Sequence, residues 1–100
     1  MIEMLYGLQV ADEPLYAAYR AEMMPLLETY AGRFVVDVRV QEVLRTPGEK
    51  TLNRLFTIRF PSQERLNEFF ADPAYLTIRK RFFEPSVAHF ETLGRYQVLP

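Results

Sequence analysis

Apolar and polar residues alternate along four stretches of the chain. In residues 2–10 every even-numbered position is apolar, while Glu3 falls on the other side. This period of two predicts a half-buried strand. The same alternation predicts strands over residues 33–45, 51–60 and 87–99, the last with a bulge at Gly94.

Helical spacing fills the gaps between these strands. Asp12 caps a first helix, whose apolar residues recur at helical spacing until Gly32 ends it. Ser62 caps a second helix, and the pair Asp72-Pro73 breaks it and starts a further segment. That segment is expected to end near Glu84, because a proline follows.

The order of elements is therefore β-α-β-β-α-β. A chain of 100 residues is one domain by length, so we assign residues 1–100 to a single domain. This order predicts an α+β, ferredoxin-like fold with a four-stranded antiparallel sheet, its second helix broken at Asp72-Pro73.

The turn "TPGEK" allows a prediction of the register between the second and third strands. Residues 47–49 are taken as a three-residue loop, with Gly48 free to adopt a positive φ. This register places Val36 opposite Phe60, Val38 opposite Ile58 and Val40 opposite Phe56. It also pairs Asp37 with Arg59 and Glu42 with Arg54.

The predicted pair of Glu42 and Arg54 lies on the side of the sheet that faces the helices. A cross-strand ion pair is its ordinary interpretation. If the pair lines a cavity between sheet and helices, Arg54 can instead hold a ligand carboxylate through two hydrogen bonds. The nearby tyrosines are then either core residues or the aromatic wall of that cavity: Tyr6, Tyr16, Tyr19 and Tyr75.

The odd-numbered side of the predicted sheet has no segment left to cover it. It mixes large aliphatic residues with polar ones: Leu5, Val35, Leu55, Leu93, Asp37, Arg39, Arg59, His89 and Arg95. Antiparallel sheets can leave one face in water. A patch of large aliphatic side chains, however, usually marks an interface. We therefore expect a homodimer formed through the odd-numbered sheet face.

Composition narrows the classes of function. The chain has 12 basic and 13 acidic residues and a net charge of -1, which argues against a nucleic-acid partner. It has no cysteine, and we find no acidic cluster with metal-ligand spacing, so neither a metal site nor a cofactor is expected. It lacks a signal peptide and any apolar run near the roughly 20 residues that span a bilayer. We expect a cytoplasmic protein without membrane contact.

The RNA-recognition module shares this order of elements and is a specific alternative. That module carries a glycine-punctuated aromatic motif on its third strand. Here the third strand reads "NRLFTIRF", without glycines, and Phe56 and Phe60 share the helix-covered face. Bases stack on aromatic side chains of an open face, so RNA binding is not expected.

The stretch "DPAYLTIRKRFF" combines aromatic residues with three consecutive cations. On a helix, Tyr75, Ile78 and Phe82 share one face, and Arg79 borders that face. A solvated basic edge is the ordinary interpretation. The functional alternative is a rim of positive charge at a pocket mouth, with Arg79 reaching inward toward an anionic ligand.

His89 is the single histidine and the candidate for proton transfer. Glu91 lies two positions along the same face of the strand and can orient it. The ordinary interpretation is a strand residue at the dimer seam. No nucleophile triad or phosphate-binding loop accompanies it.

Three segments resemble a known family. They are "YAGR" at 30–33, "NRLFTIRFPS" at 53–62 and "FFADPAYLTIRKR" at 69–81. Together they are similar to the signature of the domain of unknown function 1330 family, in the dimeric α/β-barrel superfamily. Members often have two glycines where this chain has Ala31-Gly32. The resemblance implies a ferredoxin-like dimer and no established activity, although the superfamily includes cofactor-free monooxygenases, haem-degrading enzymes, isomerases and ligand binders.

From these observations we expect a small-molecule binding protein with a mostly aromatic cavity under the helices, gated by Arg54 and Tyr75. Its ligand is a small organic molecule with an anionic form. The expected ligand-binding residues are Arg54, Glu42, Tyr75, Tyr16, Tyr19 and Arg79. The alternative is a cofactor-free enzyme of the monooxygenase or isomerase type, using His89 or a tyrosine for proton transfer. A third is a structural dimer without a ligand.

Overall fold

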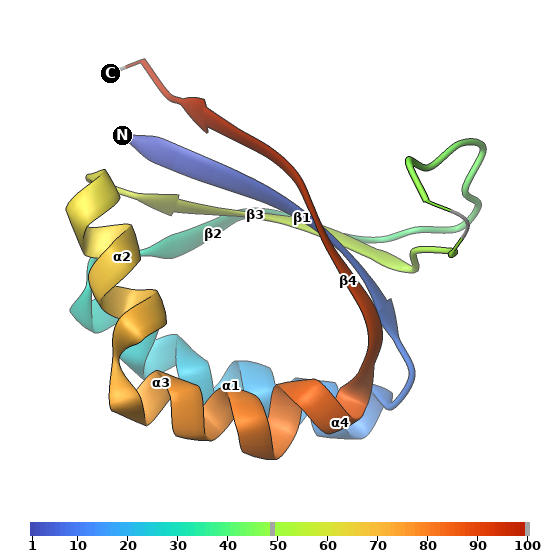
Figure 1. The fold of residues 1–100 in the computed structure, drawn as a ribbon, viewed down its shortest axis with the longest axis horizontal. Coiled ribbons are helices and arrows are strands. Elements are labelled where there is room, and N and C mark those ends of the chain that lie inside the picture. Colours follow the sequence, from blue (N-terminus) through green and yellow to red (C-terminus); the bar gives the residue numbers. More distant parts are fainter. Residues whose placement is uncertain (49, 100) are drawn as a thin grey trace.

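The protein, described by a computed structural model over residues 1–48 and 50–99, has one sheet covered on one face by helices. Figure 1 shows all the helices on the same side of the four strands. The elements are β1 (Ile2–Val10), α1 (Glu13–Thr29), β2 (Arg33–Arg39), β3 (Arg54–Phe60), α2 (Gln63–Ala71), α3 (Pro73–Ile78), η1 (Arg79–Phe83), α4 (Glu84–Ser86) and β4 (Val87–Gln97). The strands follow the antiparallel order β2-β3-β1-β4. The predicted ferredoxin-like fold is confirmed.

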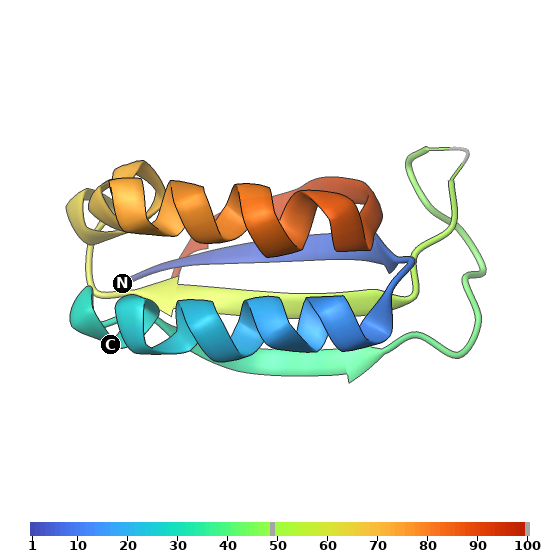
Figure 2. The same ribbon diagram turned by 90° about the horizontal axis from the view of Figure 1, so that it is seen from below.

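The helices form a single layer on one face of the sheet, arranged in two rows that lie side by side. In Figure 2, α1 runs under the β2 side, and the helices α2 to α4 run under the β4 side. The core between helices and sheet is largely aromatic, and its fully buried members include Tyr16, Phe60 and Phe69. No helix within the described residues is long and apolar enough to cross a membrane.

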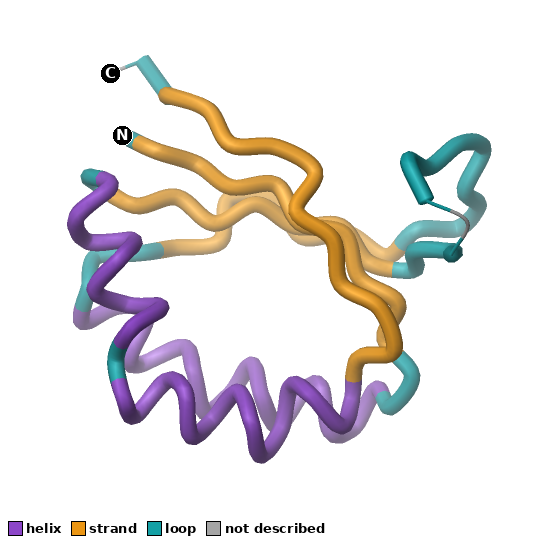
Figure 3. Tube along the Cα trace, viewed as in Figure 1, coloured by secondary structure: helices purple, strands orange, loops and turns teal. Residues whose placement is uncertain are grey.

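The helix caps occur where the sequence predicts them. Asp12, Ser62 and Asp72 each accept a hydrogen bond from a backbone N–H in the first turn of the helix that follows. The break at Asp72-Pro73 is therefore confirmed, and Figure 3 shows it as a short loop between α2 and α3. The expected stop at Glu84 is wrong, because a π-helical turn at η1 carries the helix on to Ser86.

The end of α1 is closed by two hydrogen bonds in a Schellman arrangement. The N–H of Ala31 donates to the Glu28 carbonyl at 2.9 Å, and the N–H of Gly32 donates to the Leu27 carbonyl at 3.0 Å. Ala31 takes the left-handed conformation, with φ of 58°. Gly32 is required for a different reason, since a Cβ there would lie 2.4 Å from Leu27 Cδ1.

The predicted register of the β2–β3 hairpin is wrong. Phe34 pairs with Ile58, and after an irregularity Asp37 pairs with Phe56 and Arg39 with Arg54. The physical reason is that β2 ends at Arg39, so the connection is far longer than a three-residue loop. The predicted loop also includes Glu49, which lies outside the described residues.

The irregularity in β2 changes which side chains face the helices. The backbone N–H of Val36 donates to the Thr57 hydroxyl at 3.0 Å instead of to a strand carbonyl. Beyond this point Asp37 and Arg39 face the helices, while Val36 and Val38 face the open side. The sequence analysis placed all four on the opposite faces, because a bulge reverses the alternation.

A second irregularity occurs where the sequence predicts a bulge, beside Gly94. Leu5 pairs with Gly94, but Tyr6 pairs with Thr92, which leaves Leu93 as the extra residue. As a result Arg95 faces the helices, and its guanidinium contacts Gln63 of α2. The predicted place of Arg95 on the open face is therefore wrong.

Candidate anion-binding site

A cleft opens between the first turns of α1 and the adjoining ends of β2 and β3. Its volume is about 410 Å³. The residues that line it are Glu13, Pro14, Tyr16, Ala17, Arg20, Arg39 and Arg54. Three of these seven side chains carry a guanidinium group, and Pro14, Tyr16 and Ala17 add apolar surface beside them.

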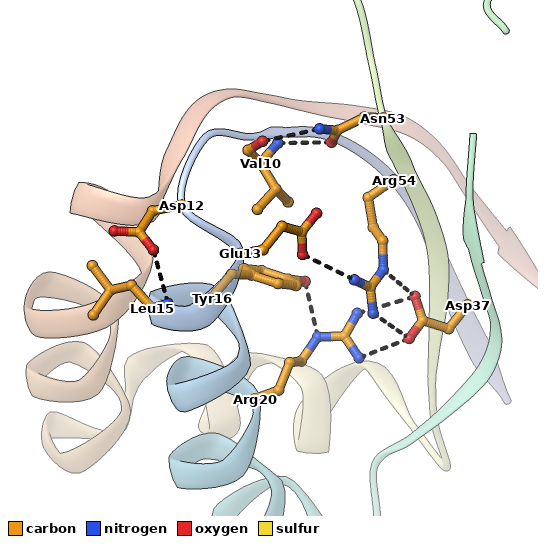
Figure 4. Close-up of polar contacts among 9 residues, drawn as sticks. All are labelled: Val10, Asp12, Glu13, Leu15, Tyr16, Arg20, Asp37, Asn53 and Arg54. Atoms are coloured by element: carbon orange, nitrogen blue, oxygen red, sulfur yellow. Dashed lines mark hydrogen bonds and ion pairs between the residues drawn. The ribbon is translucent and has the colours of Figure 1, made fainter. Parts of the chain in front are cut away.

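Two arginines share one carboxylate beside this cleft (Figure 4). Arg54 donates to Asp37 from Nε at 2.8 Å and from Nη2 at 2.9 Å. Arg20 donates to the same carboxylate from Nη1 at 3.1 Å and from Nη2 at 3.3 Å. Each guanidinium therefore uses one of its edges on Asp37, which fixes both planes.

Aromatic side chains contact both guanidinium groups. Arg20 Nε donates to the Tyr16 hydroxyl at 2.8 Å, and Arg20 Cζ lies 3.8 Å from the centre of the Phe34 ring. Arg54 Cζ lies 5.4 Å from the centre of the Tyr16 ring. The Arg20 and Arg54 side chains are only 14% and 15% exposed, so their charges are partly removed from water.

The local sequence explains why Arg54 starts its strand at this place. Asn53 accepts a hydrogen bond from Val10 N at 2.8 Å and donates one to Val10 O at 2.9 Å. This pair of bonds ties the start of β3 to the end of β1, as Figure 4 shows. Arg54 is the next residue, and its side chain extends toward Glu13 and Tyr16 of α1 (Figure 4).

The charges in the cleft do not balance. Three guanidinium groups face the carboxylates of Asp37 and Glu13, which leaves one positive charge in excess. Burial alone would raise the pKa of Asp37, but the hydrogen bonds and charges of Arg54 and Arg20 outweigh it and lower that pKa. Burial raises the pKa of Tyr16, so its hydroxyl stays protonated at neutral pH.

One edge of Arg54 remains open to the cleft. Its Nη1 has no hydrogen-bond partner among residues 1–48 and 50–99, and Glu13 Oε2 lies 3.9 Å away. The Glu13 side chain is 50% exposed and can move aside. Arg39 also lines the cleft, without an ion pair to any described residue. These two groups are the free donors that an incoming anion would meet.

The structure separates the predicted site residues into two places. Arg54 and Tyr16 meet at the cleft, as expected. Tyr19, Tyr75 and Arg79 line a smaller aromatic cavity elsewhere under the helices.

Two of the predicted site residues lie elsewhere. Glu42 does not pair with Arg54, because β2 ends before it and the register differs; it is exposed in the following loop. His89 lies on the open face opposite Gln9, with Nε2 3.4 Å from Glu91 Oε2, and lines neither site. The described residues contain no group of three His, Cys, Asp or Glu side chains that could hold a metal ion.

The sequence analysis missed Arg20, Asp37 and Arg39 as site residues. Arg20 follows Tyr16 by four positions on a helix, so their shared face was visible in the spacing. Asp37 and Arg39 were assigned to the open face, and only the bulge in β2 brings them to the helices. No local signal in the "VVDVR" stretch reports that bulge.

The match of a family model now identifies the chain. The family described as domain of unknown function 1330 matches residues 4–90, and the chain belongs to it. The matched range includes every residue that lines the cleft. No curated protein matches the sequence.

Solved structures share the fold at low sequence identity. A protein of unknown function from Rhodopseudomonas palustris is 22% identical with a TM-score of 0.82, over 99% of this chain and 82% of that one. A dabb family protein with a ferredoxin-like fold from Mesorhizobium loti is 14% identical with a TM-score of 0.67, over 99% and 97%. A dimeric protein of unknown function with a ferredoxin-like fold, from Bacteroides fragilis, is 10% identical with a TM-score of 0.65, over 97% and 95%.

Proposed function

We propose that this protein binds a small organic anion in the cleft, through the carboxylate of the ligand. The observation that carries the proposal is the open Nη1 edge of Arg54, fixed in place by the bidentate contact of its other edge with Asp37. A donor that is already oriented loses little entropy when a ligand binds. The neighbouring Arg39 supplies a second positive charge at the mouth.

The size and lining of the cleft agree with a ligand of modest size. Its volume of about 410 Å³ lies in the usual range of small-molecule sites. The apolar atoms come from the first turns of α1, where Pro14 and Ala17 face the guanidinium groups. A ligand with a carboxylate and a compact apolar body therefore fits this site: the carboxylate meets the guanidinium groups, and the apolar body meets Pro14 and Ala17.

The groups at the cleft favour binding over proton abstraction. Arginine does not lose its proton in proteins, and the raised pKa of Tyr16 keeps that phenol protonated. His89, the expected base of the enzyme alternative, lies on the other face of the sheet. Binding without chemistry is thus the simpler use of these residues.

Calorimetric titration with benzoate tests the proposal, with neutral benzamide as the matched ligand control. Benzoate should bind and benzamide should not. Arg54→Gln should weaken benzoate binding about tenfold or more, since a hydrogen bond to a charged group contributes about 1.5–3 kcal/mol. Glu13→Gln should strengthen binding, because it removes the carboxylate nearest to Nη1.

Arg81→Gln is the matched control variant, because it removes one positive charge from the exposed side of η1, away from the cleft. It should bind benzoate as the wild type does. Equal affinity in the wild type and Arg54→Gln would contradict the proposal. So would equal binding of benzoate and benzamide.

We further propose that two copies of the chain pair through the open sheet face. Val36 and Val38 are 48% and 45% exposed there, and Val38 pairs with Leu55 of β3. Leu5 of β1 and Leu93 of β4 lie farther across the same face. The β2 bulge adds these valines and removes Asp37, so the face is more apolar than the sequence pattern indicates. Such a patch favours an interface. The similar Bacteroides fragilis protein is described as dimeric, which supports the proposal.

A further inference from the structure

A second, smaller space lies between the helices and the β1–β4 side of the sheet. Its volume is about 30 Å³, and its lining is almost entirely aromatic. The residues around it are Tyr6, Tyr19, Phe56, Ile58, Phe70, Tyr75, Arg79, Phe83 and Phe90. None of these residues lines the anion-binding cleft, so the two spaces have separate walls.

Three phenol groups supply hydrogen bonding in this aromatic cavity. The hydroxyls of Tyr19 and Tyr75 lie 2.8 Å apart, so one of them donates to the other. The O–H of the accepting tyrosine is then available to donate to a third group. Tyr6 is 7% exposed, and its hydroxyl has no hydrogen-bond partner among the described residues. Some of the surface of this hydroxyl stays accessible, so it can donate a hydrogen bond to a ligand atom or a water molecule in the cavity.

These phenols are donors at neutral pH. Burial raises the pKa of Tyr6 to about 12, and it raises those of Tyr19 and Tyr75 as well. Since they stay protonated, they cannot serve as bases near neutrality. They can instead direct O–H groups toward an oxygen that carries negative charge.

Arg79 adds the only guanidinium group to the lining of the cavity. It forms no ion pair within residues 1–48 and 50–99, and its Cζ lies 5.6 Å from the centre of the Phe83 ring. Its position depends on η1, the π-helical turn that begins with Arg79 itself. Such turns often occur at functional sites.

We propose that this aromatic cavity is a second binding site, and that its ligand is a small planar phenol bound as the phenolate anion. The oxygen would lie between the Tyr6 and Tyr75 hydroxyls and Arg79, and the ring would pack among the phenylalanines. The site is distinct from the carboxylate cleft and does not depend on it.

The ligand requires the cavity to widen. A volume of about 30 Å³ holds a water molecule rather than a ring. We place this widening on the side toward solvent, where the Phe83 ring of η1 packs 5.7 Å from the Phe90 ring of β4. Phe90 is 40% exposed, so an outward movement of its ring breaks contacts only on its covered side, where it packs against Tyr6 and Phe83.

Absorbance titration of 4-nitrophenol tests the proposal, because its anion is coloured and its neutral form is not. An oxyanion site should lower the pH at which the bound dye ionises. Tyr6→Phe keeps the ring and removes only the hydroxyl without a partner, so it should fold normally and weaken dye binding severalfold. Arg79→Gln should weaken dye binding about tenfold.

Arg54→Gln, in the separate cleft, should leave the dye titration unchanged. Loss of the dye signal in Arg54→Gln with retention in Tyr6→Phe would assign the dye to the cleft and overturn this proposal. Absence of any shift in dye ionisation, or a shift that all three variants share, would overturn it too. The benzoate titration is read independently, so failure of one proposal does not imply failure of the other.

Discussion

At the scale of single residues, Ala31 has an unfavourable backbone conformation and Asp37 carries a partly buried charge. Ala31 has a positive φ of 58°, which costs an alanine about 1 kcal/mol relative to a glycine. Asp37 is held between two arginines and carries its charge partly away from water. Both features affect stability in ways that a mutation or a pH change can measure.

Ala31→Gly should raise the free energy of unfolding by about 1 kcal/mol, because glycine adopts the left-handed conformation without strain. Urea denaturation at neutral pH measures the change. The neighbouring Gly32→Ala is the contrasting variant and should destabilise the protein, since its Cβ would meet Phe60 Cε1 at 2.7 Å. A destabilised Ala31→Gly protein would contradict the assigned conformation.

The lowered pKa of Asp37 predicts a loss of stability in acid. A carboxylate whose pKa is lower in the folded state stabilises the protein above the unfolded pKa, about 4 for aspartate. That contribution is lost as pH falls from about 4 through the folded value. Asp37→Asn should therefore flatten the pH dependence of the melting temperature below pH 4, whereas Glu28→Gln, at an exposed helix position, should not.

At the scale of elements, the sequence predicts the helix caps, which depend on local residues. It does not predict the β2 bulge, which depends on pairing with another strand. Asp12, Ser62 and Asp72 were all recognised as caps, since a cap requires only its own residue and the next turn. The β2 bulge was missed, because it depends on Thr57 of the neighbouring strand. That single omission misplaced Asp37 and Arg39, which are two of the five charged groups at the cleft.

The cap at Asp72 joins two elements and should matter more than the cap at Ser62. The Asp72 side chain accepts from Ala74 N at 2.8 Å and from the Tyr30 hydroxyl at 2.5 Å. Among the described residues, the Ser62 side chain accepts only from Arg65 N, at 3.2 Å. Asp72→Ala should lower the melting temperature more than Ser62→Ala does. Tyr30→Phe should account for part of the difference. Equal effects of the two cap variants would contradict this assignment.

At the scale of the whole molecule, the helices cover one face of the sheet and leave the other face open. Val38→Arg places a charge on the open face and should convert the proposed dimer into a monomer, measured by light scattering after size-exclusion chromatography. Leu76→Arg is the matched control, because Leu76 is similarly exposed, at 47%, but lies on α3. A wild-type monomer, or a Val38→Arg dimer, would contradict the proposed interface.

Binding of an organic anion by Arg54, in the cleft beside α1, can be localised residue by residue. The most direct measurement is an amide NMR titration of the ¹⁵N-labelled protein with benzoate, on the wild type and on Arg54→Gln. If benzoate binds in the cleft, the signal changes concentrate at the start of α1, the end of β2 and the start of β3, and they disappear in the variant. Changes centred elsewhere, or changes that persist without the guanidinium of Arg54, would contradict it.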